Sequence, residues 1–226
     1  MNLKTEKYYW KKGYSIIIGI DEAGRGPLAG PVTAAAAAVN LKIKNQKEKL
    51  KIKDKKFKKI LRNTKDSKKL SGKQREQIFK LIQNCPDIKF TVSSVGPKTI
   101  DKINIERATQ KAMKNCLQKL LSAEDVKDKK ILILVDGNQT LPLHRSFLKN
   151  AKIVQRAIIK GDDKIFSIAL ASVIAKVTRD KKMTKLGKEY PKYKFEIHKG
   201  YPTKLHRKLI KKYGQCEIHR KSYRLK

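Results

Sequence analysis

Cysteine is scarce in this chain of 226 residues. The three cysteines, Cys85, Cys116 and Cys216, are an odd number and include no Cys-x-x-Cys pair. This pattern excludes a disulfide framework as the basis of stability and is typical of a reduced, intracellular protein. We therefore expect a cytoplasmic location.

Long apolar runs are also missing. No run approaches the roughly 20 residues that a membrane-spanning helix requires. The first residues, MNLKTEKYYWKKGY, lack the apolar stretch of a secretory signal peptide. The sequence therefore predicts a soluble protein with no membrane partner.

Acidic residues are few: 20 aspartates and glutamates stand against 56 lysines and arginines, for a formal net charge of +36. Such a charge attracts polyanions, and phosphate neutralisation dominates sequence-independent affinity for nucleic acids. A proteome that uses lysine wherever a surface permits would give the same excess, so both readings stay open. Hydrophobic residues make up 39% of the chain, which favours a globular fold over a disordered basic tail.

Apolar runs bounded by turn residues predict strands at 14–20, 88–95, 129–136 and 152–160. Helical spacing predicts helices beginning near the capping pair Ser71 and Gln74, and over 105–121, 165–180 and 203–212. The alanine-rich stretch 29–39 fits either a helix or a strand. Residues 41–65 carry eleven lysines and one arginine and indicate an exposed, partly helical excursion. Alternating strands and helices predict an α/β sheet with covered faces.

Carboxylates follow the ends of these predicted strands. Asp21, Asp136 and Asp162 each come directly after an apolar run, and Glu22 stands beside the first. If the strands are parallel, their ends share a crevice at one sheet edge. Clustered carboxylates repel one another, so some must be protonated or a cation must lie among them. Any one aspartate alone would more often cap a helix or close a turn, but all three together, with Glu22 beside the first, favour a shared site.

The ligand chemistry of such a cluster can also be predicted. Oxygen donors without histidine or cysteine favour hard cations, Mg²⁺ or Mn²⁺. Carboxylates that hold two such ions suit hydrolysis of a phosphodiester. Just beyond them, Gly24-Arg25-Gly26 fits either a tight turn or a segment whose backbone N–H groups a ligand can approach closely.

The segment GIDEAGRGPLAGPV resembles the opening motif of the ribonuclease HII family, the type 2 ribonucleases H. The resemblance continues in the same order through DSKKLS, IDKINI, ILVDGN, KGDDKIFSIALASVIAKVTRD, HKGYPTKLH and IHRKSY. It covers residues 14 to 224. Ribonuclease HIII, a related family, has an additional N-terminal domain and a different sequence in place of GRG, so the HII family is preferred.

The resemblance implies a ribonuclease H-like fold, a central mixed five-stranded sheet flanked by helices with a small helical C-terminal region. It implies a basic segment at 1–13, a catalytic domain at 14–182 and a C-terminal region at 183–226 that completes the substrate site. Members cut the RNA strand of RNA–DNA hybrids. They also nick duplex DNA 5′ of a single embedded ribonucleotide, leaving 3′-hydroxyl and 5′-phosphate ends. We expect the chain to act as a monomer, with accessory protein partners not specified.

The resemblance also assigns roles to residues. It implies that two Mg²⁺ or Mn²⁺ ions are held by the catalytic carboxylates Asp21, Glu22, Asp136 and Asp162. Glu22 fits this set only if the strand ends there or its carbonyl takes part, because successive strand residues point to opposite faces. The implied substrate contacts are Gly24, Arg25 and Gly26 at the ribose 2′-hydroxyl, Tyr201 stacked on the adjoining deoxyribose, and Ser67, Lys68, Asn104, Ser172 and Lys176.

A different class of function remains possible on composition alone. A non-catalytic basic nucleic-acid-binding protein would explain the charge without any chemistry. Carboxylates at strand ends argue against it, because a protein that only binds phosphates gains nothing from a negative crevice. Asp163, next to Asp162, adds a further carboxylate, which the spacing to ASVIAK assigns to solvent or to a supporting position.

Overall fold

The structure is a computed structural model that describes residues 1–39, 55–64, 70–124, 126–144 and 151–224. Ser67, Lys68 and much of the lysine-rich stretch therefore lie outside the described residues. In chain order the elements are α1 (Lys4–Lys11), β1 (Ile16–Ala23), β2 (Val32–Val39), α2 (Lys55–Asn63), α3 (Gly72–Gln83), β3 (Ile88–Val95), α4 (Pro97–Ser122), β4 (Lys130–Asp136), β5 (Lys152–Ile158), α5 (Gly161–Lys164), α6 (Phe166–Glu189), the 3₁₀ turn η3 (Pro191–Tyr193), α7 (Phe195–His198) and α8 (Lys204–Tyr213).

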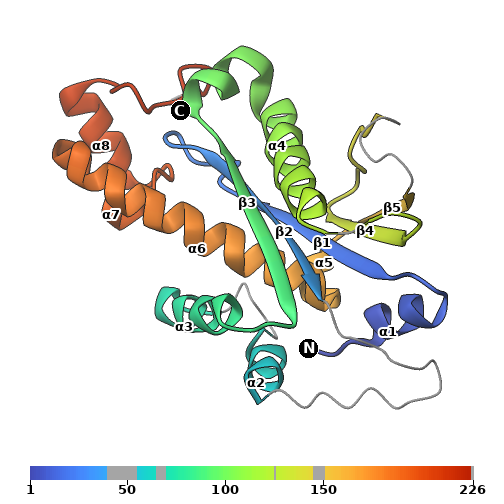
Figure 1. Cartoon of the computed structure of the whole chain (residues 1–226). Coiled ribbons are helices and arrows are strands. Elements are labelled where there is room, and N and C mark those ends of the chain that lie inside the picture. The colour runs from blue at the N-terminus through green and yellow to red at the C-terminus, as the bar shows by residue number, and fades with distance from the viewer. Residues whose placement is uncertain (40–54, 65–69, 125, 145–150, 225–226) are drawn as a thin grey trace.

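The strands form one five-stranded mixed sheet in the order β3-β2-β1-β4-β5. Strands β1 to β3 form an antiparallel meander, whereas β4 lies parallel to β1 and β5 lies parallel to β4. Figure 1 shows α4 on one face of the sheet and α6 on the other. The predicted mixed sheet with flanking helices is confirmed.

Both faces of the central strands are buried, as the apolar run in β1 predicts. Ile17 packs in the cluster beneath α6, whereas Ile18 and Ile20 pack in the cluster beneath α4. The ambiguous alanine stretch forms β2, which pairs with β1 on one side and β3 on the other. Hydrogen bonding to a strand on each side therefore outweighs the helix preference of alanine. The small side chains let both helix layers approach the sheet.

Several helix boundaries agree with the sequence pattern. The predicted capping box of α3 is present, with Ser71 and Gln74 exchanging side chain to backbone hydrogen bonds. Helix α4 differs, because it begins at Pro97 and is interrupted at Asn104, whose backbone has φ 65° and ψ 169°. The Asn104 side chain accepts a hydrogen bond from the N–H of Arg107 and so starts the second part of the helix.

The first helix, α1, packs on the core through Leu3 and Trp10. Its Glu6 is fully buried, and the Glu6 carboxylate accepts a hydrogen bond of 2.9 Å from the backbone N–H of Ser167, in the first turn of α6. The N–H groups of a first helical turn lack partners within the helix. A carboxylate from the start of the chain therefore caps the helix that crosses the central strand.

No helix in the described part of the chain is long and apolar enough to cross a membrane.

Helix α6 crosses β1 in direct backbone contact at Gly19. A Cβ atom on Gly19 would lie 2.1 Å from the carbonyl carbon of Ser167 and 2.3 Å from the nitrogen of Ile168. Since neither contact involves a flexible side chain, a methyl group there must move the helix off the sheet.

We predict that Gly19→Ala lowers the free energy of unfolding by on the order of 3 kcal/mol, because overpacking against backbone is not relieved by a rotamer change. Urea denaturation measures this difference. The control is Gly72→Ala at the exposed start of α3, where a Cβ meets nothing within 4 Å. That variant is expected to change stability by less than about 1 kcal/mol. Equal stability of the two variants would contradict the close approach.

Candidate active site

Parallel pairing of β1, β4 and β5 brings the predicted carboxylates to one edge of the sheet. Ile20 is in register with Val135, so Asp21 and Asp136 follow as neighbours on adjacent strands. The expectation that each aspartate directly follows a strand holds only loosely. Asp21 lies inside β1, Asp136 is the last residue of β4, and Asp162 lies in α5 after a two-residue turn.

The turn into α5 places Gly161, the residue before Asp162, against Asp136. The backbone N–H of Gly161 donates a hydrogen bond of 2.7 Å to Asp136 Oδ1. A Cβ on Gly161 would lie 3.2 Å from that oxygen and 2.6 Å from Ile168, so only glycine permits this approach without a shift. Asp162 is fully buried, whereas Asp163 is exposed to solvent, which agrees with the choice of Asp162 over its neighbour.

Asp21 occupies an unfavourable environment for a negative charge. Burial raises the pKa of the Asp21 carboxyl well above its ordinary value, and the charges of Glu22 and Asp136 raise it further. Hydrogen bonds from the Ser172 hydroxyl and from the N–H of Glu22 act in the opposite direction. Three neighbouring carboxyl groups thus compete for protons in a partly dry site, an arrangement that a cation would stabilise.

Glu22 points to the opposite face of β1 from Asp21, as strand alternation requires. It lines a cavity of about 290 Å³ that it shares with Asp136. Burial raises the pKa of Glu22, and the cation of Arg25 opposes this shift. The Arg25 guanidinium lies 3.5 Å from the Glu22 carboxylate. Glu22 is therefore held towards the GRG segment.

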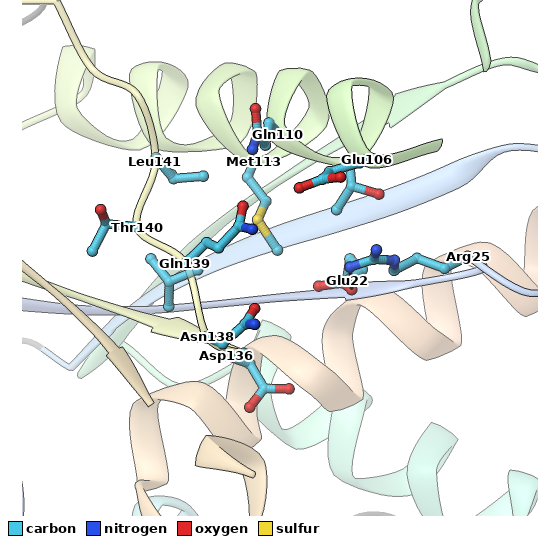
Figure 2. Close-up of a pocket in the computed structure, with 13 residues that line it drawn as sticks. Glu22, Arg25, Glu106, Gln110, Met113, Asp136, Asn138, Gln139, Thr140 and Leu141 are labelled. Atoms are coloured by element: carbon cyan, nitrogen blue, oxygen red, sulfur yellow. Dashed lines mark ion pairs between the residues drawn. The ribbon is translucent and has the colours of Figure 1, made fainter. Parts of the chain in front are cut away.

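The cavity lies between β1, the loop that follows β4, and the side of α4 that faces the sheet (Figure 2). Glu22 and Arg25 lie on one wall, with Glu106, Gln110 and Met113 of α4 across from them. The amide of Asn138 lies beside Asp136, and the amide of Gln139 points towards Met113 (Figure 2). The cavity is thus lined with carboxylates and amides in a strongly basic chain.

Metal-binding geometry is not complete in the structure. Within the described ranges, no group of three or more histidine, cysteine, aspartate or glutamate side chains is gathered closely enough to hold a metal ion. The chemistry of the donors nevertheless fits a hard divalent cation, because Asp21, Glu22 and Asp136 offer oxygen ligands whose mutual repulsion a cation removes.

The GRG segment leaves β1 and turns back towards β2. Gly24 has φ +97°, and a Cβ there would lie 2.0 Å from Arg179 Nε and 2.8 Å from the carbonyl oxygen of Pro31. Gly26 differs, because it has no positive φ and its Cβ would meet nothing within 4 Å. The fold therefore requires glycine at position 24 but not at position 26. Arg25 and Gly26 are exposed to solvent.

The Tyr201 segment is joined to the loop that follows the GRG segment. The N–H of Leu28 donates to the carbonyl of Gly200 at 2.8 Å, which joins the two segments. Lys176 Nζ lies 5.2 Å and Arg179 Cζ 5.5 Å from the centre of the Tyr201 ring. Lys176 also forms an ion pair of 2.8 Å with Asp180. Asn104 is exposed at the interruption of α4.

Buried histidines hold the backbone around Tyr201. The N–H of Gly200 donates to His198 Nδ1, so the Nε2–H of His198 donates to the carbonyl of Tyr193. His206 Nδ1 donates to the carbonyl of Tyr201, which leaves its Nε2 to accept from His219 Nε2 at 3.1 Å. This chain of hydrogen bonds requires neutral imidazoles. Burial is the main cause that lowers the pKa of His206 to about 4, and the charge of His198 contributes to this shift.

Comparison with known proteins decides the family. The family model for ribonuclease HII matches residues 18–226. A ribonuclease HII of Caldicellulosiruptor saccharolyticus is 44% identical over 220 residues, which cover 97% of this chain and 92% of that protein. The chain belongs to the ribonuclease HII family.

Solved structures of the fold agree with this assignment. The crystal structure of ribonuclease H2 from Pyrococcus horikoshii matches with a TM-score of 0.67 and 26% identity, and covers 93% of this chain and 94% of that one. Bst-RNase HIII in complex with Mn²⁺ matches with a TM-score of 0.63, covering 89% of this chain and 64% of that one. At 19% identity, the second match shows the fold alone.

Membership of the ribonuclease HII family makes this chain a metal-dependent endoribonuclease that acts on RNA–DNA hybrids. The alternative of a non-catalytic basic binder is set aside. The excess of positive charge is compatible with an enzyme whose substrate is a polyanion.

Some residues near the site carry no signal in the sequence. Arg179 and Arg220 are fully buried and hold the loop that contains GRG, yet arginine is ordinarily a surface residue. The block IHRKSY belongs to the resemblance, but nothing in its letters indicates which side chain turns inwards. Glu106 and Gln110 could have been assigned to one face of α4 by helical spacing, but not to a cavity.

We predict that His206 makes stability pH-dependent. Its pKa falls from 6.5 to about 4 on folding, so the unfolded chain binds more protons between these values and stability is lost as pH falls. Because the raised pKa values of Asp21 and Glu22 act in the opposite direction, the comparison is made with His206→Asn. The stability advantage of the unsubstituted chain over this variant should shrink by about 2 kcal/mol between pH 7.5 and pH 5.

Urea denaturation at the two pH values measures this advantage. An advantage that stays constant with pH would contradict the assignment of a neutral, hydrogen-bonded His206.

Proposed function

We propose that this enzyme hydrolyses the phosphodiester on the 5′ side of a ribonucleotide embedded in duplex DNA, in addition to cutting RNA–DNA hybrids. The observation that carries this proposal is the junction between the GRG segment and Tyr201. Their backbones are joined through Leu28 and Gly200, and Arg25 of the same segment reaches the carboxylate of Glu22. The surface that recognises a single ribose would thus lie beside the carboxylates.

The 2′-hydroxyl is the group by which a protein distinguishes RNA from DNA. The exposed N–H groups of Arg25 and Gly26, and the open space above Gly26, suit close approach of a ribose and its neighbouring phosphate. Tyr201 would then stack on the adjoining deoxyribose. Lys176, Ser172 and Asn104 are assigned to the phosphate or to support of the carboxylates.

Asp21, Glu22, Asp136 and Asp162 are the residues that would hold two Mg²⁺ or Mn²⁺ ions. When bound, the ions would supply an activated water molecule and neutralise the charge that develops on the leaving oxygen. The Ser172 hydroxyl would keep Asp21 oriented, and the N–H of Gly161 would keep Asp136 oriented. The Mn²⁺ complex of Bst-RNase HIII, which shares this fold, supports a divalent ion.

The bond changes follow from the products of the family. Water attacks the phosphorus atom, the bond from phosphorus to the 3′-oxygen breaks, and that oxygen leaves with a proton as a 3′-hydroxyl. The ribonucleotide keeps the 5′-phosphate.

We predict that Asp21→Asn lowers the rate of nicking by at least ~100-fold while substrate binding is retained, because a neutral amide is a poor ligand for a hard cation. The assay uses a DNA duplex with one ribonucleotide, with Mg²⁺ and with a chelator. Asp163→Asn is the matched control, since Asp163 is exposed, and should cleave normally. Full activity of Asp21→Asn, or a product that ends in a 2′,3′-cyclic phosphate, would contradict the mechanism.

A second prediction concerns the two glycines. Gly26→Ala should keep the stability of the unsubstituted chain but slow cleavage at a single ribonucleotide by about 10-fold, because the methyl group occupies space needed only by the substrate. Gly24→Ala should instead reduce stability, since its Cβ overlaps Arg179. Thermal unfolding and single-turnover cleavage separate the two effects. Normal cleavage by Gly26→Ala would remove Gly26 from the contact surface.

A further inference from the structure

The loop 24–31 is held from below by a residue almost 200 positions away in the sequence. Arg220 donates from Nη2 to the carbonyl of Gly24 at 2.6 Å, from Nη1 to that of Arg25 at 2.8 Å and from Nε to that of Gly30 at 3.0 Å. The guanidinium fork thus binds peptide carbonyls at both ends of the loop. Because these carbonyls turn inwards, the loop cannot rotate its peptide groups freely.

Tyr223 completes this clamp. Its hydroxyl donates to the carbonyl of Arg25 at 2.6 Å and accepts from Arg220 Nη1 at 3.0 Å. The segment that carries both residues is fixed to α4, because Asp101 accepts hydrogen bonds from the backbone N–H groups of Lys221 and Ser222. The contacts to Asp101 hold the clamp independently of the loop itself.

A second buried arginine holds the other half of the loop. Arg179 of α6 donates from Nε to the carbonyl of Pro31 at 2.9 Å and from Nη2 to that of Ala29 at 3.2 Å. The same Nη2 donates to the carbonyl of Lys199, just before Tyr201. Arg179 therefore connects the loop, helix α6 and the Tyr201 segment.

These arginines are buried among peptide carbonyls, and the carboxylates of Asp101 and Asp180 only partly oppose the effect of burial on the pKa values of Arg220 and Arg179, respectively. Both are fully buried, and among the described residues neither forms an ion pair with a carboxylate. Burial lowers the pKa of Arg179 to about 10, and the charge of Arg220 contributes in the same direction. Placing two like charges in the interior is unfavourable unless they serve a purpose that neutral residues cannot.

The outer side of the loop carries N–H groups, whereas its inner side carries the carbonyls that the clamp binds. In the part of the chain that the structure describes, the backbone N–H groups of Arg25 and Gly26 have no acceptor. With the carbonyls bound below, these donors face solvent above two buried positive charges. Successive outward N–H groups in a positive field form a binding place for an anion.

We propose that Arg220, assisted by Tyr223, is a positioning residue that orients the peptide groups of Gly24–Gly26 towards the ribose and phosphate at an RNA–DNA junction. This inference rests on the proposed function of the GRG segment. Arg220 does not touch the substrate; it acts through the loop. Selectivity for a single ribonucleotide would therefore depend on a side chain hidden from the nucleic acid.

The test compares two substrates, a DNA duplex with one ribonucleotide and a continuous RNA–DNA hybrid, with kcat and KM measured for each. Tyr223→Phe removes one hydroxyl and should raise KM for the single-ribonucleotide duplex by about 3-fold with little change in kcat. Arg220→Gln should raise it by about 10-fold or more. The preference for the single ribonucleotide over the hybrid should fall in parallel, while the Mg²⁺ dependence is unchanged.

Arg224→Gln is the matched control, because it removes an exposed positive charge from the same segment and should preserve the preference. Arg220→Lys keeps the charge but loses the fork, so it should resemble Arg220→Gln. Unchanged KM and preference in Tyr223→Phe and Arg220→Lys would overturn the inference. Equal loss of activity on both substrates, in proportion to unfolded protein, would also overturn it. If the unsubstituted enzyme fails to nick the single-ribonucleotide duplex, the proposed function fails instead.

Discussion

The contact between α6 and Gly19 is the constraint on which the rest of the structure depends. A helix that meets a strand without an intervening side chain has a fixed height above the sheet. Ser172, Lys176 and Arg179 follow from that contact at intervals of roughly one helical turn. The same helix therefore supplies a hydrogen bond to Asp21, a cation near Tyr201 and a support for the loop between β1 and β2. Glu6 of α1 also stabilises this arrangement, because its carboxylate caps the first turn of α6.

The sign of the charge in this molecule changes with depth below the surface. The exterior is strongly positive, the crevice at the strand ends is negative, and two further positive charges lie beneath the loop that borders the crevice. Each layer is stable for a different reason. Surface lysines are solvated, the buried arginines donate hydrogen bonds to peptide carbonyls, and burial raises the pKa values of the Asp21 and Glu22 carboxyl groups. A phosphate strand would be attracted by the outer layer and guided by the inner ones.

The sequence reveals much of this fold because its signals are local. The apolar run of β1, the capping box of α3 and the amphipathic stripe of the later part of α4 need only neighbouring residues to be recognised, and all three are present. The alanines of β2 become a strand only because they have partners on both edges. The carboxylates can be assigned to one edge, but the backbone hydrogen bond from Gly161 to Asp136 depends on how α5 turns. Burial of Arg179 and Arg220 is least predictable, since their acceptors are carbonyls of distant residues.

The link between Arg220 and the carbonyl of Gly24 joins residues separated by 196 positions, which has a consequence for the order of assembly. During synthesis the meander of β1, β2 and β3 can pair long before residue 220 has been added. The carbonyls of the loop 24–31 then lack the guanidinium donors of Arg220, so the peptide groups of the loop are not yet held in place. Under the proposed function, a nascent chain would thus carry Asp21 and Glu22 before it could recognise a ribose. The ability to recognise substrate would be gained last, when the C-terminal segment packs against α4.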